Sequence, residues 1–365
     1  MELHAQAVLK ATESWDWPLT YCIQASGEMS GKFKVIAPKL LWGFISESQV
    51  LGGTLLDQFW IVVSQCHPKL AENVTTLRIT PFFSIPHSKA VLFEGIDRDS
   101  LNFDPIFKMA AELFTHLGIA FMNTGGRKSG IGTPYSVSDT ISMDTDALLK
   151  IAAEEGFGNR KQAALKTLIF KRDGILCPLT GATFNGENGV EPILAHIIPD
   201  AVSGKPDTMK CIAMFAGTAV RDLILRHLNG LGNVMNVESN AHTAYDDLKW
   251  GIEGQTEKGT VTYIYRRIPF STEVGPGYIT FRDGGQITFG RGPEAARLGS
   301  GPDPLLCNLQ LAVARVLKMS GAAELIGQIL EDGDDSDFAH VYIASPAFCN
   351  ILTAKLLSSG QALIY

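Results

Sequence analysis

Hydrophobic residues along the chain occur in two patterns, at helical spacing in some stretches and in short β-branched or aromatic runs in others. In the first 145 residues, runs of the second kind at 20–24, 33–36 and 77–83 predict strands. Residues 107–117 instead repeat apolar side chains every three or four positions, which predicts a helix. We therefore expect an N-terminal mixed α and β domain over residues 1–145, of no recognised type.

The rest of the chain, residues 146–365, shows the same mixture around a polar region at 172–253. The elements expected on either side of that region are helices over 145–155 and 160–171, strands of a trailing β-hairpin over 260–268 and 278–289, and a long amphipathic helix over 302–329. The predicted fold class is therefore α+β, in two domains that meet near residue 145.

Composition and charge narrow the range of functions. Hydrophobic residues make up 45% of the 365 positions and charged residues 19%, which is typical of a globular protein. With 31 Lys and Arg against 38 Asp and Glu, the net charge of −7 argues against a nucleic-acid-coating polycation. No apolar run is long enough for a membrane span, and the start lacks the pattern of a secretion signal. The six cysteines include no CxxC pair, which favours reduced thiols and an intracellular protein, cytoplasmic or nuclear.

Residues that can carry chemistry gather in the polar region. Four motifs follow one another there: Arg172-Asp-Gly-Ile-Leu-Cys-Pro-Leu-Thr-Gly181, Leu194-Ala-His-Ile-Ile-Pro199, Leu228-Asn-Gly-Leu-Gly-Asn-Val-Met-Asn-Val237 and Ala241-His-Thr-Ala-Tyr-Asp246. Together they supply His196 after an expected strand, Asn233 in a loop, and His242 at the opening of a helical turn. Hydrolysis of a phosphodiester needs a base that activates water and a cation that stabilises the developing charge.

The residue types suit those two tasks. An imidazole titrates near neutral pH, so His196 suits the base. The amide of Asn233 can brace the loop that carries the base or orient its imidazole. His242 and Asp246 are four positions apart, so on a helix they share one face and can hold one divalent ion between them.

The order and spacing of these motifs resemble the HNH nucleases, the ββα-metal or His-Me finger class, and in particular the HNH-domain proteins of mushroom-forming fungi. The resemblance covers roughly residues 160–330 and includes the closing Lys249-Trp-Gly-Ile-Glu253. It implies an HNH-like domain with its motif core at 172–253 and a C-terminal helical extension.

The resemblance also implies roles for single residues: His196 as general base, with Asn233 and His242 as further catalytic residues. His242 and Asp246 would bind one divalent metal ion, magnesium, with manganese or zinc as alternatives. Many members place a metal ligand directly before the base, where this chain has Ala195.

Three functions remain open from the sequence. The first is a metal-dependent endonuclease that cleaves DNA. The second is a repurposed HNH fold that uses His196 and His242 for acid–base chemistry on a small molecule, for instance in fungal secondary metabolism. The third is a non-catalytic interaction protein whose histidines are structural. Between residues 151 and 270, thirteen Lys and Arg balance thirteen Asp and Glu, which argues against tight binding of duplex DNA. The sequence does not determine the oligomeric state.

Overall fold

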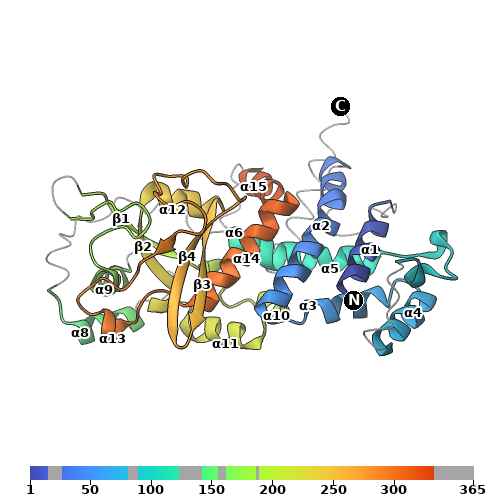
Figure 1. Ribbon diagram of the computed structural model, residues 1–365, viewed down its shortest axis with the longest axis horizontal. Helices are drawn as coiled ribbons and strands as arrows, with labels where there is room; N and C mark the ends of the chain where they lie inside the picture. The colour runs from blue at the N-terminus through green and yellow to red at the C-terminus, as the bar shows by residue number, and fades with distance from the viewer. Residues whose placement is uncertain (15–26, 81–88, 123–141, 155–161, 186–188, 333–365) are drawn as a thin grey trace. The chain divides into compact units, whose positions relative to one another are not determined.

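The computed structural model describes residues 1–14, 27–80, 89–122, 142–154, 162–185 and 189–332 (Figure 1). Contacts divide the chain into two compact units, and each is assembled from stretches that are separated in the sequence. Unit 1 contains residues 1–120, 205–218 and 316–365, and unit 2 contains residues 121–204 and 219–315. The division expected near residue 145 therefore falls inside unit 2, at the start of helix α8 (Thr145–Glu154).

Within its described residues, unit 1 is entirely helical. Its elements are α1 (Glu2–Thr12), α2 (Gly27–Leu51), α3 (Leu55–Val63), α4 (Pro68–Ile79), η2 (Lys89–Phe93), η3 (Arg98–Ser100), α5 (Asp104–Leu113), the π-helical turn η4 (Phe114–Ile119), α10 (Pro206–Ala216) and α15 (Ala322–Asp332). Three helices cross the division along the chain: α6 (Ala120–Met122), α14 (Pro304–Ser320) and α11 (Thr218–His227), of which only the first residue belongs to unit 1.

Helix α2 is the centre of unit 1 and contacts α1, α3, α5, α10 and α15. Two aromatic residues on it, both fully buried, make edge-to-face contacts with neighbouring elements. Phe33 meets Phe114 of η4 with ring centroids 5.4 Å apart, and Phe44 meets Phe215 of α10 at 5.2 Å. Such pairs add to the free energy gained by burying the rings, so one long helix organises the core of this unit.

The strands expected in this part of the chain are wrong wherever the structure describes them. Residues 33–36 lie inside α2, and the stretch that starts at residue 77 begins within α4, which ends at Ile79. The stretches 81–83 and 20–24 lie outside the described residues. The run at 33–36 is too short to reveal a helical period. The period becomes visible only along the whole of α2, where buried residues recur at helical spacing as far as Ile45. The helix expected over 107–117 is confirmed by α5 and η4.

Unit 2 combines helices with two antiparallel sheets. Its elements are α8 (Thr145–Glu154), α9 (Ala163–Asp173), β1 (Pro192–His196), η5 (Asp200–Val202), α11 (Thr218–His227), η6 (Leu231–Asn233), β2 (Val234–Glu238), α12 (Ser239–Asp246), β3 (Trp250–Glu257), β4 (Thr260–Arg267), β5 (Gln286–Ile287) and α13 (Ala295–Leu298). One sheet pairs β1 with β2, and the other has the order β3-β4-β5. The α+β class is confirmed.

The larger sheet differs from the expected hairpin. The strand expected at 260–268 is confirmed as β4, but its main partner is β3, and only Gln286–Ile287 of the stretch 278–289 pair with it. Strand β3 contains Gly251 and Gly254, which lower strand propensity and hide it from pattern analysis. A Cβ at Gly254 would lie 2.5 Å from the Cβ of Pro304. Close packing against the start of α14 therefore explains this glycine.

The long helix expected over 302–329 is two helices. Helix α14 ends at Ser320 and α15 begins at Ala322, and Gly321 between them has a φ of 82°. Glycine adopts this left-handed conformation without the steric cost that a Cβ brings. Within the described residues, no helix is long and apolar enough to cross a lipid bilayer.

Candidate functional site

The antiparallel pair of strands β1 and β2, and the helix that follows β2, carry the candidate site in unit 2 (Figure 1). Strands β1 and β2 pair antiparallel, with His196 opposite Val234 at the end of the ladder. Helix α12 starts directly after β2 and contacts both strands. The carboxylate of Glu238 fixes this start, since its oxygens accept hydrogen bonds from the backbone N–H of Asn240 at 3.0 Å and of Ala241 at 3.2 Å. This junction places α12, and His242 on it, beside strands β1 and β2.

Asn233 is fully buried at the entry to β2 and holds the segment that follows His196. Its Oδ1 accepts from the N–H of Ile198 at 2.8 Å, and its Nδ2 donates to the carbonyl of Ile198 at 2.9 Å. The same Nδ2 donates to the carbonyl of Leu228 at 2.8 Å, and the carbonyl of Asn233 accepts from the N–H of Ile197. The asparagine thus braces the loop that carries the expected base, one of the two roles that its amide suggested.

His196 lies at the end of β1 with its Nε2 shielded from solvent. Burial is the larger cause that lowers its pKa from 6.5 to about 4, and the neighbouring charge of His242 is the smaller. The imidazole is therefore neutral at pH 7. Helix α12, which carries His242, contacts β1, which ends at His196, so the elements that carry these two histidines pack together although the residues are 46 positions apart in the sequence.

His242 and Asp246 face each other on α12, with 3.3 Å between Nδ1 and Oδ2. Their side chains retain 23% and 30% of their exposure. Burial lowers the pKa of His242, and burial together with the nearby charge of Asp247 raises the pKa of Asp246 to about 7. Both shifts favour the uncharged forms, and burial is the main cause of each.

These two side chains supply an imidazole nitrogen and a carboxylate oxygen, which are ligand atoms that hard and borderline divalent ions bind. Among the described residues, no group of three His, Cys, Asp or Glu is close enough to hold a metal ion. Ala195, next to the expected base, is fully buried and offers no donor. A donor set of two fits magnesium or manganese, which keep several waters and accept phosphate oxygens, better than zinc, which prefers three or four protein ligands.

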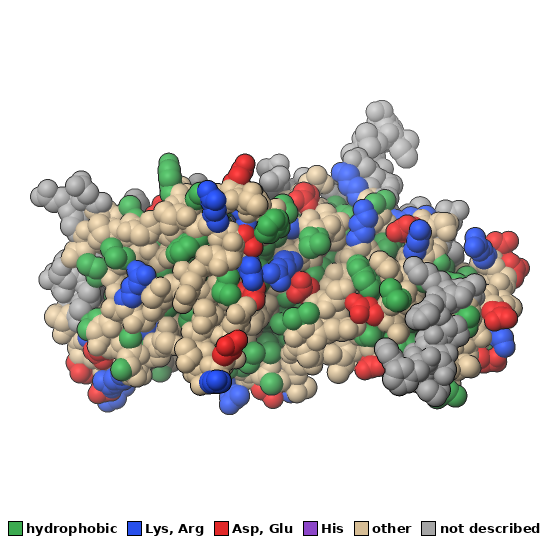
Figure 2. Space-filling view, viewed as in Figure 1, with side chains coloured by type: hydrophobic (Ala, Val, Ile, Leu, Met, Phe, Trp, Pro, Cys, Tyr) green, Lys and Arg blue, Asp and Glu red, His purple; other side chains and the backbone are tan. Residues whose placement is uncertain are grey.

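At least half of the Lys and Arg residues described in unit 2, seven of fourteen, form ion pairs with carboxylates. The ion pairs include Lys171–Glu294, Arg172–Asp173, Arg221–Asp222, Lys249–Asp247, Arg266–Glu253, Arg266–Asp283, Arg267–Glu273 and Arg297–Asp146. Figure 2 shows Lys and Arg interspersed with Asp and Glu over the visible face rather than gathered in one patch. Such a surface attracts a polyanion weakly.

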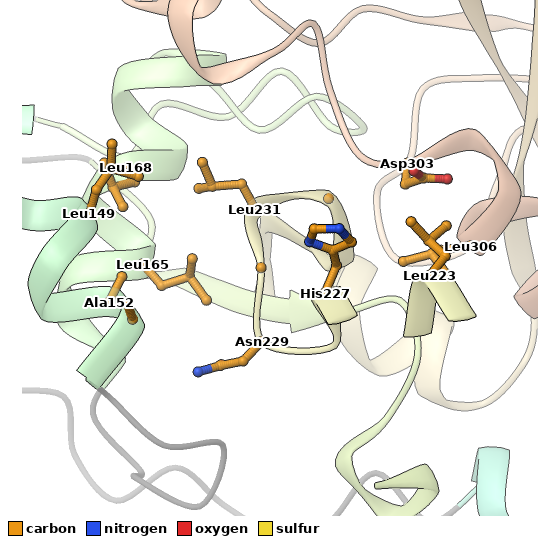
Figure 3. A pocket seen from close by; sticks show the side chains of 13 residues that line it. Leu149, Ala152, Leu165, Leu168, Leu223, His227, Asn229, Leu231, Asp303 and Leu306 are labelled. Carbon is orange, nitrogen blue, oxygen red and sulfur yellow. The ribbon is translucent and has the colours of Figure 1, made fainter. Parts of the chain in front are cut away.

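A cavity of about 460 Å³ lies beside residues 229–232, which lead into Asn233 (Figure 3). Six leucines from several elements line it, together with alanines, glycines, His227, Asn229 and Asp303. Neither His196 nor His242 is among its lining residues. A small-molecule active site built on His196 and His242 would need a cavity that reaches both residues. This apolar cavity reaches neither of them.

The Arg172-Asp-Gly motif was noted in the sequence, but no role was predicted for Arg172 or Asp173. Glu238, which fixes the start of α12, was not predicted as a site residue. Arg172 is fully buried and donates from Nη1 to the carbonyl of Leu231 and from Nη2 to that of Val234. The sequence feature that could have identified Arg172 is its position beside Asp173 at the end of an apolar stretch. Charged residues are almost never fully buried unless they are paired, and an adjacent Arg and Asp can form such a pair.

Comparison of the chain with models of known protein families, with curated proteins and with solved structures finds no match.

Proposed function

We propose that unit 2 is a metal-dependent phosphodiesterase of the HNH type that cleaves nucleic acid, with His196 as general base. The observation that carries this proposal is the packing of α12, which carries His242, against β1, which ends at His196, with Asn233 bracing the segment beside the base. The motif resemblance over residues 160–330 supports the same reading.

In this proposal each residue has a separate task. The neutral imidazole of His196 takes a proton from the attacking water. Asn233 keeps that imidazole in place through its bonds to Ile198. His242 and Asp246 would hold the divalent ion. When bound, this ion supplies positive charge against the phosphate and the leaving oxygen.

Plasmid nicking by the full chain tests the proposal. Magnesium, manganese or nickel should each be compared with a chelator, for the wild type and for His196→Ala. His227→Ala is the matched control, because the side chain of His227 is exposed at the end of α11 and has no task in the proposed mechanism. We expect metal-dependent cleavage that His196→Ala abolishes and His227→Ala retains. Folded wild-type protein that cleaves neither duplex nor single-stranded DNA or RNA with any of these ions would contradict the proposal.

Two observations favour a second candidate, acid–base catalysis on a small molecule without a metal. Ala195 provides no ligand, and Asp246 with a pKa of about 7 beside His242 can give and take a proton near neutral pH. Activity that persists in chelator but is lost in Asp246→Asn would favour this candidate over the nuclease. The third hypothesis, an interaction protein, predicts that neither the His196→Ala nor the Asp246→Asn variant changes its function.

A further inference from the structure

The guanidinium of Arg172 is joined to the loop that carries Asn233. Arg172 is fully buried at the end of α9, and its Nη1 and Nη2 donate to the carbonyls of Leu231 at 2.7 Å and Val234 at 3.0 Å. These carbonyls lie two residues before and one residue after Asn233. The guanidinium therefore bridges the backbone on both sides of the asparagine.

Asp173 neutralises this buried cation in a bidentate pair. Its Oδ1 accepts from Nε of Arg172 at 3.0 Å and its Oδ2 accepts from Nη2 at 2.7 Å. Oδ1 also accepts from the N–H of Gly290 at 3.0 Å, which ties the pair to a second segment of unit 2. A buried guanidinium that is paired and hydrogen-bonded in this way has a fixed orientation.

We infer that Arg172 is a positioning residue of the candidate site: it fixes the backbone on either side of Asn233, so that the asparagine can brace Ile197 and Ile198 directly after His196. The chain of contacts has two steps, from the guanidinium to the carbonyls of the loop and from Asn233 to the backbone of Ile198. The assignment rests on the proposed function only in taking His196 as the base.

The neighbouring cation provides a matched control. Lys171 is also buried at the end of α9, but its Nζ pairs with Glu294 at 3.1 Å. Among the described residues, its side chain makes no hydrogen bond to the Asn233 loop. Removing Lys171 therefore disturbs a buried ion pair one residue away, while the bonds to Leu231 and Val234 remain. A general loss of packing should affect Lys171 and Arg172 variants alike.

Amide hydrogen exchange on the full chain tests this without requiring activity. The N–H groups of Ile197 and Ile198 donate to Asn233, whereas the N–H of Tyr265 donates to Gly285 in the other sheet. In Arg172→Lys we expect exchange at Ile197 and Ile198 to become at least about tenfold faster relative to Tyr265. Lys171→Met should leave this ratio as in the wild type. An unchanged ratio in folded Arg172→Lys would overturn the inference.

Two further measurements complete the test. If Arg172→Lys does not fold, the double variant Arg172→Gln/Asp173→Asn removes both buried charges at once, and the same exchange ratio decides the outcome. If the wild type cleaves nucleic acid, the Arg172 variant should lower kcat at least about tenfold with KM little changed, because positioning acts on the base and not on substrate binding. A wild type without activity contradicts the proposed function, while the exchange ratio still decides the role of Arg172.

Discussion

Asn233 and Ile198, 35 positions apart in the sequence, are joined by a reciprocal pair of hydrogen bonds. Oδ1 of the asparagine accepts from the N–H of Ile198, and Nδ2 donates to its carbonyl. Only a carboxamide presents a donor and an acceptor in this arrangement to a backbone, so aspartate cannot replace it.

Removing this clasp should cost stability. In Asn233→Ala three buried side-chain hydrogen bonds are lost, and we expect the free energy of unfolding to fall by about 3 kcal/mol. Asn236→Ala is the control, because Asn236 is also buried but its recorded bond is a single donation to the carbonyl of Lys166, so about 1 kcal/mol should be lost. Urea unfolding of the two variants measures the difference, and equal losses would argue against the clasp.

The depressed pKa of His196 makes stability depend on pH in the acid range. In the unfolded chain this imidazole binds a proton below about pH 6.5, but in the folded protein only near pH 4, so stability falls as the pH falls between these values. The contribution is on the order of 2–3 kcal/mol. His196→Gln should remove this part of the acid destabilisation, measured as the change in Tm between pH 7 and pH 4.5. A variant with the same loss of Tm as the wild type would show that other groups dominate.

Metal binding by His242 and Asp246 should release a proton. Because the pKa of Asp246 is raised to about 7, its carboxyl group is mostly protonated at pH 6 and a divalent ion must displace that proton. We expect the apparent affinity for manganese to rise between pH 6 and pH 8 and then level off. Calorimetry in two buffers with different ionisation enthalpies measures the released protons. Asp246→Asn should abolish both the release and the pH dependence, and binding that is independent of pH would contradict the assignment.

Gly254 is set by packing, and its substitution should show this. A Cβ there would lie 2.5 Å from the Cβ and 2.7 Å from the Cα of Pro304, so Gly254→Ala should destabilise unit 2 by about 2 kcal/mol. Gly327 in α15 is the contrasting case, since a Cβ would meet nothing within 4 Å, and Gly327→Ala should stabilise its helix by about 0.5–1 kcal/mol. Thermal unfolding of both variants should move Tm in opposite directions.

Local patterns allowed part of the fold to be predicted. Helices α5 and α8 and strand β4 have enough periodicity or β-branched content to be recognised from their own residues. Helix α2 was predicted as a strand because a short apolar run does not reveal its period. Strand β3 was not predicted because its glycines, which lower strand propensity, are required by close packing against α14.

The sequence by itself determined the identities and spacing of the residues on which the candidate site depends. His196, Asn233, His242 and Asp246 were identified by their chemistry and by the motifs around them, since these depend on side-chain type and sequence separation alone. Whether the residues meet depends on the pairing of β1 with β2 and on the start of α12, which are non-local contacts.

The tertiary structure decided the protonation and the support of that site. The pKa values of His196 and Asp246 depend on burial, which no linear pattern specifies. The role of Arg172 depends on two carbonyls about sixty residues away, and backbone groups do not differ from one residue to the next in a sequence. Only the folded chain shows which backbone groups a buried cation meets.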